Sequence, residues 1–176
     1  GVIGYFRGAG ENKTFVSRAG RLPPSELGCE ELHDVVALGN TVYFADEEKI
    51  LMWRDGKFSA IPCRTPARSR GARLHHVGDT VYVTALGRAL GRLVGERWEL
   101  VADDPVWREN QIVAVEAGAG ARGAGVGLTL LTAERGFFQL AADGRVTPFA
   151  TEANRLLAGK TISRATPRRW LARRGV

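Results

Sequence analysis

The chain has 176 residues, of which 44% are hydrophobic and 25% charged, a balance typical of one globular domain with a sizeable core, which excludes disorder and collagen. No apolar run approaches the roughly 20 residues that span a bilayer, and the N-terminal residues lack the basic and apolar regions of a signal peptide, so we expect a soluble domain without membrane insertion. Because the sequence opens on Gly1 rather than Met, we expect a processed product or part of a longer chain. Its compartment stays open: cytoplasm or, if a signal peptide was removed, periplasm or exterior.

Basic residues outnumber acidic ones by 25 to 19, which gives a net charge of +6. Arginine dominates over lysine, a bias that often reflects a GC-rich genome, so the charge alone does not indicate a nucleic-acid partner. Cys29 and Cys63 are too few for a disulfide scaffold and lack metal-ligand spacing. Free thiols are favoured, and a single bridge stays open for an oxidising compartment.

The chain repeats itself at a period of roughly 40 residues, the signature of a tandem array. The segment GNTVYF at positions 39–44 returns as GDTVYV at positions 78–83. A turn followed by a basic and an apolar residue occurs near positions 20, 56, 95 and 144. The array therefore has about four units of unequal loop length.

Short runs of alternating apolar and polar residues between the turns predict β-strands. An incomplete first unit supplies strands at 2–6, 14–17 and 21–23. The full units supply strands at 33–38, 41–45, 49–54 and 57–61, at 73–77, 80–85, 89–94 and 97–102, and at 111–116, 127–133, 136–141 and 145–150. Two more are expected at 161–165 and 169–173, and the Gly/Ala segment 117–127 is expected to be a flexible hairpin loop. Connections such as Asp55-Gly56 tolerate the positive φ of tight hairpins, so each full unit is predicted to be a four-stranded antiparallel meander.

Tandem meanders of this size are typical of the blades of a β-propeller, because a sheet that is apolar on both faces must stack between neighbours. We predict an all-β chain of about four blades' worth of strands. The units are placed at 1–28, 29–66, 67–105 and 106–155, with a partial unit at 156–176. Two forms stay open: a small closed ring, in which C-terminal strands complete the N-terminal blade, and an arc of a larger propeller, which we favour slightly.

The segment GNTVYFADEEKILMWRDGKFSAI at 39–61 resembles an NHL repeat and the regulator-propeller repeats of bacterial sensor proteins. Those repeats share G-N-x-V-Y-x-A-D followed by D-G-K, and the match is fair again at 78–101. The segment RWLARRGV at 169–176 is similar to the second strand of a regulator-propeller blade. The resemblance implies a fold and assigns no chemistry, since propellers host hydrolases, lyases, sensors and scaffolds.

All three histidines fall on predicted first strands, which line the central channel of a propeller. The candidate ligand-binding residues of this channel are His33, His75, His76, Glu116 and Arg164. Imidazole and carboxylate groups could hold a divalent metal, and His with Arg could hold an anion. The alternative is that the channel is filled with water, in which case polar side chains are tolerated there without any ligand. Neighbouring residues on a strand face opposite sides, so only one of His75 and His76 can point inward.

A metal site is the weaker form of this hypothesis. Propellers that hydrolyse lactones hold a divalent metal through Glu, Asn and Asp side chains near the channel mouth. The nearest analogue here is Asn110 next to Glu109, together with Glu116, without a match at the level of a motif. The metal candidates are therefore His76, Glu116 and Asn110.

The C-terminal end combines arginines with an aromatic residue, a set that can contact phosphates and stack on bases. The candidates for an anionic partner are Arg168, Arg169, Trp170, Arg173 and Arg174. Alternation along a strand leaves neither face uniformly basic, and charge that protects an edge strand explains the same residues. Nucleic acid is therefore disfavoured as a partner.

We expect a non-enzymatic propeller module that binds a protein or a small ligand, as the sensory or scaffolding part of a larger bacterial protein. Its partners would include the remainder of a larger propeller or further copies of the chain. The alternative is a metal-dependent hydrolase of the lactonase type that uses the His and Glu side chains of the channel.

Overall fold

The computed structural model describes residues 4–7, 14–17, 32–46, 49–62, 72–85, 89–108, 110–118 and 127–163. These segments form three four-stranded antiparallel sheets, one two-stranded sheet and two short helices. The predicted all-β class is therefore confirmed. In each four-stranded sheet the spatial order of the strands follows the chain, which is the predicted meander.

The bounds of the strands follow the sequence pattern closely. The first sheet contains β3 (Asp34–Leu38), β4 (Thr41–Ala45), β5 (Lys49–Arg54) and β6 (Lys57–Pro62). The second contains β7 (Arg73–Val77), β8 (Thr80–Thr84), β9 (Leu90–Val94) and β10 (Arg97–Ala102). The third contains β11 (Ile112–Ala117), β12 (Leu128–Thr132), β13 (Gly136–Leu140) and β14 (Val146–Pro148). The separate hairpin consists of β1 (Gly4–Arg7) and β2 (Thr14–Ser17).

Turn chemistry sets the register of the hairpins. Asp55 and Gly56 have φ of 49° and 79°, the two positive values that a two-residue type I′ turn requires. The turn brings Arg54 opposite Lys57 and Met52 opposite Ser59. These four side chains therefore share one face of the sheet.

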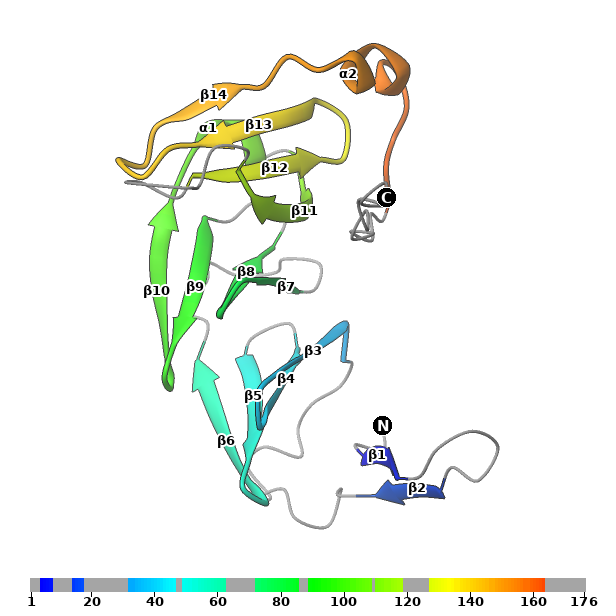
Figure 1. Cartoon of the computed structure of the whole chain (residues 1–176), viewed down its shortest axis with the longest axis vertical. Helices are drawn as coiled ribbons and strands as arrows, with labels where there is room; N and C mark the ends of the chain where they lie inside the picture. Colours follow the sequence, from blue (N-terminus) through cyan, green and yellow to red (C-terminus); the bar gives the residue numbers. More distant parts are fainter. Residues whose placement is uncertain are drawn as a thin grey trace, which may run out of the picture.

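The three large sheets follow one another along an arc, with β3, β7 and β11 side by side on its inner side (Figure 1). One core, which includes Ile50, Ile61 and Val81, fills the space between the first two sheets. A second core, which includes Leu90 and Leu130, fills the space between the second and third. Over the residues that are described, the sheets do not close into a ring, so the small closed ring is not found there.

The end of the chain differs from the prediction. Residues 161–163 form no strand, so the strand expected at 161–165 is wrong over these residues. Instead, the Ile162 amide donates to the Ala133 carbonyl oxygen at 2.8 Å. The strands predicted at 21–23 and 169–173 lie outside the described residues.

Two short helices connect and cover the sheets. The helix α1 (Pro105–Arg108) joins the second sheet to the third and places Trp107 in the core between them. The helix α2 (Glu152–Leu157) begins after Thr151, whose Oγ1 accepts from the Asn154 amide at 3.2 Å. Its Leu157 packs on the outer face of the third sheet. In the segments that the structure describes, no helix is long and apolar enough to cross a membrane.

A carboxylate joins the first sheet to the second at the inner strands. Asp34 Oδ1 accepts from the Val35 amide at 2.9 Å, and Asp34 Oδ2 accepts from the Leu74 amide of β7 at 3.0 Å. Leu74 is buried, so its N–H depends on this acceptor. The side chain of Asp34 thus supplies a hydrogen bond between two sheets.

Replacing Asp34 with Ala should lower the free energy of unfolding by about 1–3 kcal/mol, because the buried Leu74 N–H loses its acceptor. The Asp34→Asn variant keeps an acceptor oxygen in the same place and should lose clearly less. Urea unfolding of both variants, followed by tryptophan fluorescence, measures the difference. Equal losses in the two variants would contradict the bridging role.

Candidate functional site

The inner strands hold His75, one of the histidines that the sequence placed in a channel. His75 Nε2 lies 2.9 Å from Thr84 Oγ1, and Thr84 Oγ1 donates to the Ile112 carbonyl oxygen at 3.4 Å. The hydroxyl oxygen is then left to accept from Nε2–H of a neutral imidazole. His75 and Thr84 therefore connect the second sheet to the third, as Asp34 connects the first to the second.

Burial lowers the pKa of His75 to about 4, because the charged imidazolium loses its hydration between the sheets. Nearby Asp34 opposes this shift, and Arg73 adds to it by like-charge repulsion. The imidazole is neutral at physiological pH as a result.

The other channel candidates are not gathered around His75. His76 is exposed whereas His75 is half-buried. His33 is exposed at the start of the first sheet. Glu116 is exposed on β11, and partial desolvation raises the pKa of its carboxyl.

Asn110 has a structural hydrogen bond. It is buried, and its Oδ1 accepts from the Glu134 amide at 3.1 Å. Within the described ranges, no three His, Cys, Asp or Glu side chains come close enough together to hold a metal ion. The proposed set of His76, Glu116 and Asn110 thus stays a prediction without a described cluster.

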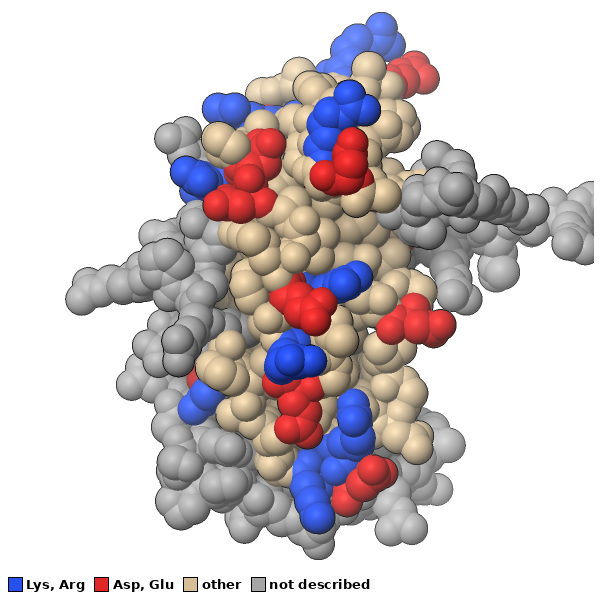
Figure 2. Space-filling model, turned by 90° about the vertical axis from the view of Figure 1, so that its left-hand side faces the viewer, with Lys and Arg blue, Asp and Glu red and all other residues tan. Residues whose placement is uncertain are grey.

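The arginine-rich end, which includes Arg164, Arg168, Arg169, Trp170, Arg173 and Arg174, lies outside the described residues, as do Cys29 and Cys63. On the face shown in Figure 2, Lys and Arg side chains alternate with Asp and Glu. Two of the described ion pairs are Arg92 with Glu99 at 3.1 Å and Arg108 with Asp103 at 3.2 Å. This face therefore has no continuous basic stripe.

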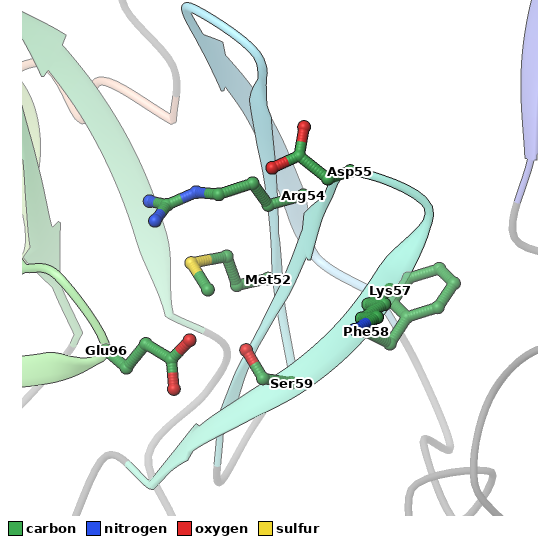
Figure 3. A pocket seen from close by; sticks show the side chains of 7 residues that line it. All are labelled: Met52, Arg54, Asp55, Lys57, Phe58, Ser59 and Glu96. Atoms are coloured by element: carbon green, nitrogen blue, oxygen red, sulfur yellow. The ribbon is translucent and has the colours of Figure 1, made fainter.

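A hollow of about 460 Å³ opens between the first and second sheets, at the end where the β5–β6 and β9–β10 turns lie. Its lining includes Met52, Arg54, Lys57 and Ser59 of the first sheet and Glu96 of the β9–β10 turn. Met52 also belongs to the core between the two sheets, so this face of β5 and β6 looks toward the second sheet. Figure 3 shows Met52, Arg54 and Ser59 projecting to the same side, toward Glu96.

Two polar groups of this hollow are placed by the fold. Arg54 Nε donates to Thr41 Oγ1 at 2.8 Å, and Thr41 is itself buried on the same face of the sheet. This bond orients the guanidinium and leaves its terminal N–H groups directed away from β4. Ser59 Oγ is buried and has no hydrogen-bond partner in the described part of the chain.

The charges that line the hollow are of both signs. Arg54 and Lys57 extend from the two ends of the β5–β6 turn, and Asp55 of that turn also lines the hollow. Glu96 extends from the opposite sheet. Among the residues that are described, none forms an ion pair with Arg54, Lys57 or Glu96. The first-sheet side of the hollow thus carries two cations and one carboxylate, and the second-sheet side carries the carboxylate of Glu96, above the apolar Met52.

Sequence reasoning did not identify this hollow. In the sequence, the D-G-K turn at 55–57 indicates only the repeat, and Glu96 belongs to its second copy. A signal was present, because cross-strand pairing across a two-residue turn predicts that Arg54 and Lys57 share a face. No local pattern predicts that Glu96 lies opposite them.

Comparisons of the chain with protein-family models, with curated proteins and with solved structures gave no match. The resemblance of residues 39–61 to NHL and regulator-propeller repeats therefore stays a prediction from the sequence.

Proposed function

We propose that the chain is a non-enzymatic binding module of the propeller type, and that it takes a small ligand or a segment of a partner protein in the hollow between its first two sheets. The observation that carries this proposal is the hollow itself, in which an oriented arginine, a buried serine hydroxyl without a partner and a glutamate surround an apolar floor. Ligand sites commonly combine an apolar lining with a few convergent polar groups in roughly 300–1,000 Å³.

The packing of the sheets supports the propeller part of the proposal. The first strands of successive sheets lie side by side on the inner side of the arc, as expected for adjacent blades (Figure 1). The outer face of the first sheet is also apolar across all four strands, in the row Val35, Phe44, Leu51 and Ala60. Leu51 is fully buried in this row, whereas Val35 at its edge is 56% exposed.

The third sheet, at the other end of the arc, has a more polar outer face than the first sheet. The outer face of the third sheet carries a polar row across its four strands, formed by Glu116, Thr129, Gln139 and Thr147. Next to that row, α2 covers the apolar residues. The outer faces of the first and third sheets thus differ, one with an apolar row and the other with a polar row.

A screen of mixed small molecules and short peptides against isotope-labelled protein tests the proposal. We expect saturable shifts of the backbone amide signals of Met52, Lys57, Ser59 and Glu96. The Arg54→Gln variant should weaken binding of an anionic hit by about 10-fold or more, since it loses charge-assisted hydrogen bonds.

The Arg92→Gln variant is the matched control. It also removes one arginine, but Arg92 pairs with Glu99 on the face of the second sheet that is turned away from the hollow. It should leave the affinity unchanged. Shifts that cluster elsewhere, or equal effects of the two substitutions, would overturn the proposal.

A further inference from the structure

We propose that the hollow between the first two sheets selects a small zwitterion: a ligand whose carboxylate binds at Arg54 and whose ammonium group binds at Glu96, as in a free amino acid. The inference rests on the proposed function and names the chemistry of the ligand.

The carboxylate half of the site is formed by the first sheet. Because Thr41 Oγ1 occupies the Nε–H of Arg54, the terminal N–H groups of the guanidinium remain for a ligand. Two parallel N–H donors in a fixed plane match the two oxygens of a carboxylate. Lys57 lies directly opposite Arg54 in the β5–β6 register and adds a second cation on the same face.

Ser59 supplies a hydroxyl deeper in the hollow. Its Oγ is shielded from solvent and has no partner within the described residues, which costs free energy unless a ligand completes the bond. Ser59 pairs with Met52 across β5 and β6, so the hydroxyl stands beside the apolar floor. A ligand carboxylate or carbonyl oxygen can accept from it once the atoms that shield Oγ move aside.

The ammonium half comes from the second sheet. Glu96 projects from the β9–β10 turn toward Ser59 and Met52 (Figure 3). A ligand that carried only a carboxylate would bring its charge close to Glu96 without compensation. A ligand that carried only an ammonium group would meet Arg54 and Lys57, whose two positive charges outnumber the one negative charge of Asp55 on that side. A ligand with a carboxylate at one end and an ammonium group at the other can pair with Arg54 and with Glu96 at the same time.

The experiment measures the affinity of the full chain for glycine, β-alanine, γ-aminobutyrate and δ-aminovalerate by calorimetry at low ionic strength, where exposed charges are least screened. Each zwitterion is compared with its methyl ester, which lacks the carboxylate, and with its N-acetyl derivative, which lacks the ammonium group. We expect one chain length to bind best. Either modification should weaken that ligand by about 10-fold or more.

Charge variants separate the two halves of the site. The Arg54→Gln variant should weaken the zwitterion and its N-acetyl derivative and leave the methyl ester unchanged or improved. The Glu96→Gln variant should weaken the zwitterion and improve the N-acetyl derivative, because it removes a repulsive charge. The Arg92→Gln control should match the unaltered chain for every ligand.

The outcomes distinguish this inference from the proposed function. Binding of the N-acetyl derivatives as tightly as the zwitterions, or no effect of Glu96→Gln, would overturn the zwitterion and leave a simple anion site. Saturation of the hollow by another class of compound, with no amino acid binding, would overturn the inference while the binding module stands. If no probe shifts the signals of the hollow, both proposals fall.

Discussion

The Trp107→Ala variant is expected to lose about 3–5 kcal/mol of unfolding free energy, the usual cost of removing a large aromatic side chain from a core. Trp107 is 1% exposed and is the largest fully buried side chain of the described residues. It extends from α1, the connection between the second and third sheets, into their shared core. The variant loses apolar burial and leaves a cavity at the only helical link between these sheets within the described segments.

The Trp107→Phe variant is the matched control, because it keeps an aromatic ring in the same core. It also removes the indole N–H, which is buried without a partner in the described part of the structure. We expect a loss of about 1 kcal/mol, since part of the volume is lost while an unsatisfied donor disappears. Urea unfolding followed by far-ultraviolet circular dichroism measures both variants. A loss below about 1 kcal/mol in Trp107→Ala would show that α1 does not anchor the core.

Acid should destabilise the fold through His75, by up to about 3 kcal/mol between pH 6.5 and pH 4. The pKa of His75 is about 4 in the folded chain, against 6.5 for the free side chain. Between these values the unfolded chain binds the proton and the folded chain does not, so unfolding becomes more favourable as the pH falls. This stability is fully present above pH 6.5 and is lost as the pH approaches 4.

The His75→Gln variant isolates this effect, because its side chain keeps an N–H donor for Thr84 and does not titrate. We expect the stability difference between the unaltered chain and this variant to depend on pH only within that window. Glu116 acts in the opposite direction: the pKa of its carboxyl is raised in the folded chain, so its small contribution falls as pH rises. That contribution is common to both chains and cancels. A difference that is independent of pH would contradict the burial of a neutral His75.

The three large sheets could be predicted almost residue by residue. The strands β4, β5, β7 and β10 have the predicted bounds, because strict alternation between two-residue turns fixes both the face and the end of a strand. The predicted bounds were less accurate in the third sheet, where β14 ends at Pro148 rather than at residue 150. The helix α2 was missed because six residues capped by Thr151 and held by packing carry too little helical periodicity to detect.

The candidate site was harder to predict than the fold. First strands do meet on the inner side of the arc, and His75 does face a neighbouring sheet. Its imidazole, however, bonds to Thr84, and the exposed His76 and Glu116 are not gathered with it. The sequence showed which residues lie on first strands, but not which polar groups would form hydrogen bonds with one another.

Local patterning alone determined that this chain forms successive four-stranded meanders, since the period of the side chains and the chemistry of the turns act over neighbouring residues. Only the tertiary structure decided that the described sheets form an arc and that a hollow opens between the first two. Arg54 and Glu96 belong to the first and second sheets, and their approach depends on how one core of buried side chains fills the space between those two sheets. That packing is a property of the whole assembly of sheets, so no segment of the sequence contains it.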